Sequence, residues 1–389
     1  MDQKQSSWLY KAAMLSISLV LVTGGSISAA LPEMAKTMSG VSPAGINLIA
    51  TIPQGAVIIF LVLSGAFVKK IGIKKTILLG LLIMSVAGIV PAFTNNYWLI
   101  LVSRFVFGAG IGLYNALAVT IINLRFSGSE QSTLLGYRVS MESIGASVAS
   151  MLVGVLLPLG WHSVFFIYLA ALPIAFFFYR YVPEIEVPEH DEAAETATQG
   201  GLDWKNLVLS LVFMILVMTQ ITIILQIPQV MLERQISNAS IASMVVALFT
   251  FSGMIGGFLF GRLYTMWHRY ALSIFLVGSF AGLMTLYSAH SLVIMVLGTF
   301  IAGVSGSLMC TSIFNLMTNV TAPSKQAFAN TVILLGANVG SFAAPFGIQF
   351  AQSMLGRTAE TPLLFFGTLI IMVSIIFIFA SRFYTEEQA

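Results

Sequence analysis

The chain has 389 residues, of which 58% are hydrophobic and only 8% are charged, with a formal net charge of +3. Water-soluble domains carry about 25% charged residues, so this composition excludes a soluble globular protein and indicates a polytopic membrane protein. The single cysteine, Cys310, cannot form a disulfide within the chain and gives no metal-binding cluster.

Twelve long apolar segments follow a short polar N-terminus. The first is too long for the core of a signal peptide, so we expect it to be retained. A helix needs about 20 apolar residues to cross a bilayer, and segments of this length exclude a β-barrel. We therefore predict an all-α membrane protein with twelve transmembrane helices. The predicted spans are 8–32, 45–68, 74–94, 97–120, 133–158, 161–182, 206–228, 238–262, 269–288, 291–317, 326–351 and 361–382.

One long polar connection, residues 184–205, separates the sixth predicted span from the seventh. It is rich in Asp and Glu and has no apolar pattern, so we interpret it as a solvated acidic linker. It divides the chain into an N-terminal six-helix bundle, residues 1–183, and a C-terminal six-helix bundle, residues 206–389. Most Lys and Arg residues fall on the side of the N-terminus, whereas Lys36, Arg234 and Arg357 fall opposite. Positive loops face the cytoplasm, which predicts that both termini and the linker are cytoplasmic.

The two halves also resemble each other at an offset near 196 residues. Leu31-Pro32-Glu33 ends the first predicted span and Ile227-Pro228-Gln229 ends the seventh, and Gly145 corresponds to Gly340. Several weak matches in one order indicate a duplicated six-helix unit of the parallel-repeat kind. In such proteins the substrate site lies near the membrane midplane, between the halves.

Arg138 and Glu142 are the charges of greatest interest, because they lie inside the fifth predicted span. At a 1.5 Å rise per residue, Glu142 lies roughly 14 Å above the inner end of that span. Their i,i+4 spacing puts both on one helix face. An ionisable group at this depth is a functional candidate by default. Glu142 would carry a proton or meet a cationic substrate, and Arg138 would alternatively bind an anionic one. A static buried salt bridge is the competing interpretation.

Polar residues in other spans are candidates for lining the same cavity. Tyr114 and Asn115 in the fourth span come out level with Glu142. The further candidates are Gln54, Gln220, Gln226, Asn315 and Asn338. Each of these further candidates fits an interhelical hydrogen bond equally well.

The loop after the second span reads Gly65-Ala-Phe-Val-Lys69-Lys70-Ile-Gly72-Ile-Lys74-Lys75. Together with the 6+6 arrangement of spans, it resembles the major facilitator superfamily over the whole chain. The loop is similar to the first signature of that family, but Lys69 stands where the family has an acid. The resemblance implies that Gly65, Lys69, Lys70, Gly72 and Lys74 form a loop that latches one conformation. Four lysines at an inner loop also fit a plain topogenic signal.

Two further signatures of this family have counterparts. Arg104, with Gly108 and Gly112, resembles the second signature, whose buried arginine is tied to proton coupling in the family. The two glycines also fit close helix packing. Gly145 and Gly154 keep the glycine spacing of the third, antiporter signature, but its proline is absent from this span.

The closest resemblance is to the drug:proton antiporters of this family. It implies a monomeric plasma-membrane transporter that works by alternating access and exports amphipathic organic compounds, multidrug-like, in exchange for protons. Its partners would be a small-molecule substrate, the proton and the lipid bilayer, with no cofactor beyond the proton gradient. A transporter of a specific metabolite or organic anion is the alternative, and a non-transporting receptor or a lipid flippase belongs to other classes. No phosphate-binding loop, metal cluster or nucleophile pattern occurs, so we expect neither an enzyme nor a nucleic-acid-binding protein.

Overall fold

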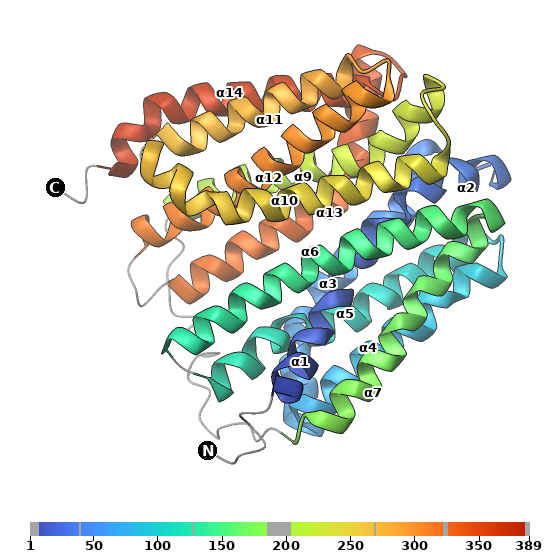
Figure 1. Cartoon of the computed structure of the whole chain (residues 1–389), viewed down its shortest axis with the longest axis vertical. Helices are drawn as coiled ribbons and strands as arrows, with labels where there is room; N and C mark the ends of the chain where they lie inside the picture. Colours follow the sequence, from blue (N-terminus) through green and yellow to red (C-terminus); the bar gives the residue numbers. More distant parts are fainter. Residues whose placement is uncertain are drawn as a thin grey trace. The chain divides into compact units, whose positions relative to one another are not determined.

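The computed structural model describes residues 8–38, 40–126, 128–184, 204–267, 270–321 and 326–385. Every regular element in these ranges is a helix (Figure 1). The chain forms two compact units, Met1–Glu189 and His190–Ala389. The division falls within the predicted acidic linker 184–205. Residues 185–203 of that linker lie outside the described ranges, so its solvated character stays a prediction.

The first unit contains the helices of the first six predicted spans, coloured blue to green in Figure 1. In chain order these are α1 (Trp8–Ser16), η1 (Ile17–Val20), η2 (Thr23–Ala30), α2 (Leu31–Thr37), α3 (Pro43–Ile71), α4 (Ile73–Ile89), η3 (Val90–Phe93), α5 (Tyr97–Arg125), α6 (Gly128–Leu156), η4 (Leu157–Leu159), η5 (Trp161–Ala170) and α7 (Ala171–Tyr181).

The second unit contains the helices of the remaining six predicted spans, coloured yellow to red in Figure 1. They are α9 (Trp204–Glu233), α10 (Ala239–Trp267), α11 (Ala271–Tyr287), α12 (Leu292–Val320), α13 (Gln326–Leu355) and α14 (Thr361–Thr385). The apolar core of this unit draws residues from all six helices, among them Phe213, Val245, Phe275, Met309 and Phe377.

Each of the twelve predicted segments contains one or more of these helices. Among the described residues, ten helices are long and apolar enough to cross a membrane, and a bent pair, Trp8–Val20 with Thr23–Thr37, raises the number to eleven. α11 is apolar but has only 17 residues. The protein is therefore an all-helical, multi-pass membrane protein. Twelve spans, and the cytoplasmic position of both termini, stay predictions.

Side-chain caps explain where several of these helices begin. The Ser42 hydroxyl accepts a hydrogen bond from the Gly45 amide at the start of α3, and Pro43 follows at the first helical position. The Asn96 carboxamide oxygen accepts from the amides of Trp98 and Leu99 at the start of α5. Such caps satisfy amides that have no partner inside the helix.

The first span is not a continuous α-helix. It bends by 40° at Leu21 and Val22, between η1 and η2. Its sequence there is Thr23-Gly-Gly-Ser-Ile-Ser-Ala-Ala, and paired glycines next to serines weaken an α-helix. The span thus consists of two helical segments that meet at a bend. The length and overall hydropathy of the span did not predict this bend.

Candidate functional site

Arg138 and Glu142 form an ion pair on α6. The Nη2 atom of Arg138 lies 2.7 Å from Oε1 of Glu142. Their side chains are 15% and 19% exposed, so both charges are largely removed from solvent. The Nε atom of Arg138 is buried and has no hydrogen-bond partner among the described residues. The pair therefore keeps one guanidinium donor without a partner among the described residues.

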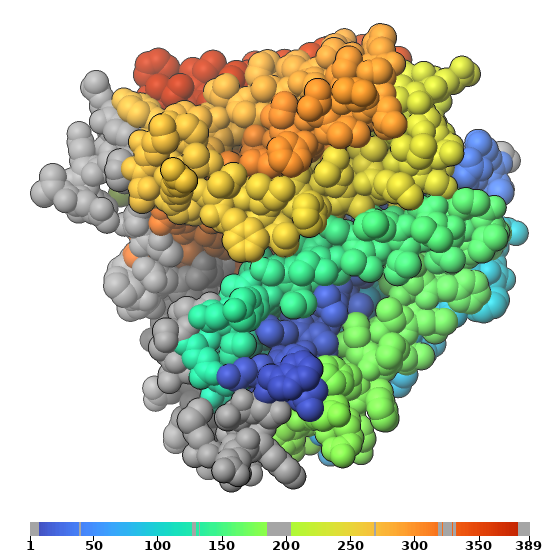
Figure 2. Space-filling view, viewed as in Figure 1, coloured from blue at the N-terminus to red at the C-terminus, as the bar shows by residue number. Residues whose placement is uncertain are grey.

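The small residues on α6 pack against the broken first span. A Cβ atom on Gly145 would overlap the backbone of Leu19, in η1. One residue on, the Ala146 carbonyl accepts a 3.3 Å hydrogen bond from the hydroxyl of Ser26 in η2. Figure 2 shows α6 lying alongside the first span on the surface of this unit. Glu142 is thus one helical turn from the place where α6 meets the break.

Arg104 in α5 makes contacts that connect four predicted spans. It is fully buried, and its Nε and Nη2 atoms donate to the carbonyls of Ile49 and Gly24, at 3.1 and 2.8 Å. The guanidinium also lies over the rings of Phe107 and Tyr168, at 4.3 and 5.1 Å. Within the described ranges no carboxylate pairs with it. Its contacts join α5 to α3, to η2 beside the break, and to η5.

Of the other polar candidates of this unit, Tyr114 lies close enough to Glu142 to interact with its charge, but its hydroxyl has a different partner. Tyr114 is fully buried, and its hydroxyl donates to the Met84 sulfur, 3.4 Å away on α4. Its ring also closes over Gly80 of the same helix. Asn115 on α5 and Gln54 on α3 are half-buried. The Tyr114 hydroxyl thus points toward α4, and its depth in the membrane stays a prediction.

Of the candidates in the second unit, Gln220 and Gln226 stand out. Both lie on α9, and the amide nitrogen and oxygen of each are buried with no partner among the described residues. Gln226 is fully buried, whereas Gln220 packs against Gly306 of α12, where a Cβ would overlap its amide. Asn338 is half-buried and donates to the Leu334 carbonyl of its own helix, and Asn315 is also half-buried. α9 therefore carries two buried amides with no partner among the described residues.

The predicted signature loop is mostly helical: Gly65, Lys69 and Lys70 lie in α3 and Lys74 lies in α4, so only Gly72 connects the two helices. Gly72 adopts a φ of +83° there, a backbone conformation that glycine adopts without strain. Gly65, Lys69 and Lys70 are exposed, and the Lys74 ammonium lies 4.8 Å from the centre of the Tyr179 ring of α7. Lys74 therefore packs against α7, the last helix of the sixth predicted span.

Sequence reasoning missed the acid that accompanies this loop. The Oε1 atom of Glu184, which follows α7, lies 3.0 Å from the position that a Gly72 Cβ would take. Arg125, the last residue of α5, donates through Nη2 to the Glu184 carbonyl, at 3.3 Å. A carboxylate thus lies beside Gly72, although Lys69 stands at the position that is acidic in the family. The lysine at the acidic position was the signal that pointed to a substitute.

Metal ligands do not cluster in the described part of the chain. No group of three or more His, Cys, Asp or Glu side chains there lies close enough to hold an ion.

Comparison with known proteins gives the family. The family model of the Major Facilitator Superfamily matches residues 13–345. The chain is 29% identical over 182 residues to MFS transporter L2 of a Phoma species, covering 44% of this chain and 30% of that protein. It is 25% identical over 208 residues to the multidrug efflux pump SdrM of Staphylococcus aureus, covering 53% of this chain and 45% of the pump. The chain thus spans less than half the length of these two relatives.

The fold is also that of a solved transporter. The crystal structure of the nucleoside transporter NupG superposes with a TM-score of 0.73 at 14% identity, covering 97% of this chain and 98% of that one. At this identity the likeness concerns the fold alone. With the family model matching most of its length, the chain belongs to the Major Facilitator Superfamily of membrane transporters.

Proposed function

We propose that this chain is a secondary active transporter that exports amphipathic organic compounds in exchange for protons. The single observation that carries the proposal is the Arg138–Glu142 ion pair, largely buried within a transmembrane helix. Replacing such a pair by apolar residues is often neutral or stabilising, so stability is a poor reason to keep it. Intramembrane ionisable pairs typically mark ion and proton pathways.

The chemistry of proton coupling follows from the pair. When Glu142 is ionised, its charge and that of Arg138 cancel across 2.7 Å. When Glu142 takes up a proton, the guanidinium loses its counter-charge inside a helix that packs directly on the broken first span. The two protonation states therefore favour different surroundings for α6. A proton gradient then biases the transporter between the conformations that suit each state.

The export of amphipathic compounds is supported by the relative SdrM, a multidrug efflux pump. We also propose that the protein lies in the plasma membrane with both termini in the cytoplasm, as the distribution of Lys and Arg predicts. We also propose a monomeric working form.

A second candidate function is the transport of an organic anion. It rests on the Nε atom of Arg138, which is buried and has no partner among the described residues. A guanidinium presents donors in a fork that matches a carboxylate, sulfonate or phosphate. In that case the anion would compete with Glu142 for the same guanidinium.

The test uses lipid vesicles that contain the purified full chain, inserted inside out, and have an acidic lumen. We expect ethidium, a lipophilic cation, to accumulate as protons leave, and Glu142→Gln to abolish that accumulation. Glu130→Gln is the matched control. Glu130 lies on the same helix and also forms an ion pair, with Lys11, but its side chain is 46% exposed at the helix start.

Accumulation that survives Glu142→Gln would overturn the proton-carrier role. The anion alternative is measured in the same vesicles with 8-anilinonaphthalene-1-sulfonate. If this anion is transported and ethidium is not, and Arg138→Gln abolishes the anion flux, the organic-anion function replaces the proposed one.

A further inference from the structure

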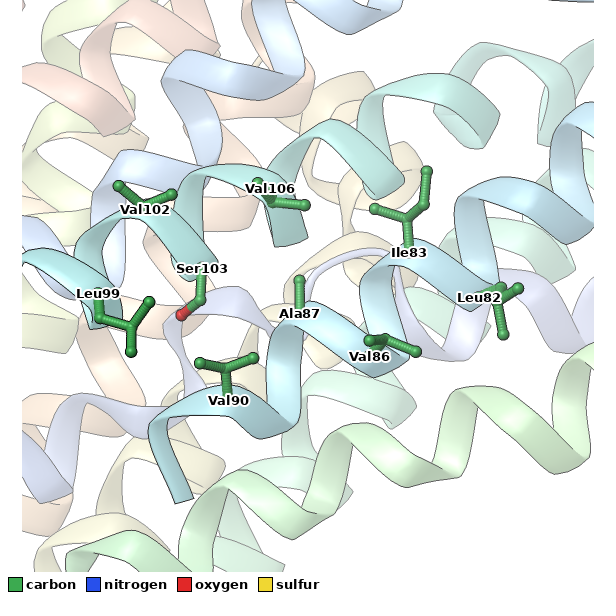
Figure 3. A pocket seen from close by; sticks show the side chains of 9 residues that line it. All are labelled: Leu82, Ile83, Val86, Ala87, Val90, Leu99, Val102, Ser103 and Val106. Carbon is green, nitrogen blue, oxygen red and sulfur yellow. The ribbon is translucent and has the colours of Figure 1, made fainter. Parts of the chain in front are cut away.

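Ionisable side chains gather in and next to the three connections at one end of the second unit. These connections join α9 to α10, α11 to α12 and α13 to α14. The proposed function uses none of their ionisable residues, which are Glu233, Arg234, Tyr287, His290, Arg357 and Glu360. By contrast, the groove between α4 and α5 of the first unit is lined by aliphatic side chains and Ser103 (Figure 3), so nothing in its lining responds to pH.

Arg234 binds the other two connections to the end of α9. It directly follows α9, and its Nη1 atom donates to the Ala289 carbonyl, at 2.5 Å, and lies 3.3 Å from Nδ1 of His290. Ala289 and His290 belong to the connection between α11 and α12. The Nη2 atom lies 3.5 Å from Oε1 of Glu360, which directly precedes α14. We refer to Arg234, His290 and Glu360 as the loop cluster.

Two further observations show that this end of α9 is held firmly. Glu233, the last residue of α9, accepts a hydrogen bond through Oε2 from the Ala359 amide, at 3.0 Å. The side chains of Arg234 and Glu360 are only 19% and 22% exposed, and Ala289 is fully buried. Because a buried carbonyl needs a donor, Ala289 keeps the guanidinium of Arg234 in place.

His290 is exposed, so it exchanges protons with the solution. A guanidinium is always charged and has donors only, so Nδ1 of His290 can accept from Arg234 only while the imidazole is neutral. Histidine gains a proton between about pH 8 and pH 5. Protonation would put an N–H and a positive charge 3.3 Å from Nη1 of Arg234, and like charges at this distance repel each other.

The other charges of the three connections do not remove this repulsion. Glu233 and Glu360 balance Arg234 and Arg357 in number while His290 is neutral. The Glu233 carboxylate accepts from a backbone amide, and the Glu360 carboxylate pairs with Arg234. Arg357 is exposed on the connection between α13 and α14 and adds a second positive charge. A proton on His290 therefore leaves one positive charge in excess.

The excess charge weakens the hold on α9. The imidazolium of His290 would either withdraw from Arg234 or draw Glu360 away from it. We propose that the loop cluster is a pH-sensitive contact, which fastens the end of α9 while His290 is neutral and releases it when His290 gains a proton. The distribution of Lys and Arg predicts that this end of the unit faces outside the cell, so the contact would respond to the external pH.

The experiment measures hydrogen–deuterium exchange of the purified full-length protein in detergent, at about pH 8 and about pH 5.5. The rates are corrected for the effect of pH on chemical exchange. The reporting amides are those of Arg234, Gln235 and Ile236, which donate to carbonyls in the last turns of α9. We expect them to exchange about threefold to fivefold faster at the lower pH, the scale of a partly exposed charge interaction.

Two substitutions separate the charge of His290 from its contact. His290→Gln keeps a hydrogen-bond acceptor that takes up no proton, so exchange at the end of α9 should be equally slow at both pH values. His290→Lys carries a positive charge at both, so exchange should be fast at both. The position is exposed, so folding is not at risk. His162→Gln, at a histidine of the first unit, is the control and should keep the wild-type pH dependence.

Three results would overturn the proposal. The first is wild-type exchange at the end of α9 that is equal at the two pH values. The second is a pH dependence that persists in His290→Gln, because another group would then cause it. The third is exchange in His290→Lys that stays as slow as in the wild type at the higher pH. The measurement needs neither substrate nor proton gradient, so its outcome is independent of the proposed export function.

Discussion

Arg138 and Glu142 neutralise each other across 2.7 Å, one turn apart on α6. Both partners of the ion pair belong to the same helix. The pair can therefore form in any conformation in which α6 stays helical. Under the proposed function, protonation of Glu142 or the arrival of a charged substrate would break it.

Removing one member of the pair should harm the protein more than removing both. Breaking a buried pair from one side typically costs about 3–5 kcal/mol, and with side chains that are 15% and 19% exposed we expect the lower end of that range. Glu142→Gln and Arg138→Gln should each lower the unfolding midpoint in detergent, and the double variant should recover most of the loss. Additive losses in the double variant would show that the two side chains do not depend on each other.

Gly145→Ala should destabilise the first unit, because its Cβ would overlap the backbone of Leu19. Overpacking of this kind costs about 1–3 kcal/mol. Gly136→Ala is the matched control on the same helix, since a Cβ there meets nothing within 4 Å. It should be neutral, or stabilising by up to about 1 kcal/mol through helix propensity. The measurement is thermal unfolding in detergent, and equal midpoints for the two variants would contradict the close contact.

Arg104→Lys tests whether position 104 needs only a positive charge or also the several donor nitrogens of a guanidinium group. Lysine keeps the charge but cannot donate from two separated nitrogens to the carbonyls of Gly24 and Ile49 at once. Hydrogen bonds from charged groups contribute about 1.5–3 kcal/mol each, so the loss of one should lower the unfolding midpoint clearly. Arg180→Lys, at an exposed position, is the control. A midpoint unchanged in Arg104→Lys would mean that charge alone suffices.

Glu184→Gln should loosen the connection between α3 and α4. The carboxylate lies against Gly72, which lysines flank on both sides in the sequence. Losing its charge should raise the rate of tryptic cleavage after Lys69 and Lys70 about threefold, the scale of an exposed ion pair. Glu33→Gln, which removes an acid paired with Lys36 on α2, is the control. Cleavage at the wild-type rate in Glu184→Gln would leave that carboxylate without a role at the loop.

Much of the fold could be predicted from the sequence because long apolar runs specify membrane helices almost unaided. The Arg138–Glu142 contact was predictable for a similar reason, since helical spacing alone brings the two side chains together. The break in the first span was not, because Gly24 and Gly25 lie in a run whose average hydropathy matches that of a helix. A local loss of helix propensity is invisible to such an average.

Tertiary contacts set the other limit. The sequence predicts a depth for Tyr114 by counting residues, but the direction of its ring follows from how α5 is rotated against α4, where Gly80 leaves room for it. Glu184 lies beside Gly72 because the C-terminal ends of α3, α5 and α7 come together. The local sequence around Glu184 or Gly72 does not predict this contact.

The bend in the first span is held from both sides. Below it, the backbone of Leu19 rests directly on α6 at Gly145. Above it, the Gly24 carbonyl is tied to the guanidinium of Arg104, and Tyr168 of η5 donates to the Thr23 carbonyl at 3.4 Å. Contacts on both sides of the bend should keep its angle fixed. We therefore expect the first span to move as one rigid body with α5 and α6, so that a change at Glu142 displaces both ends of the first span.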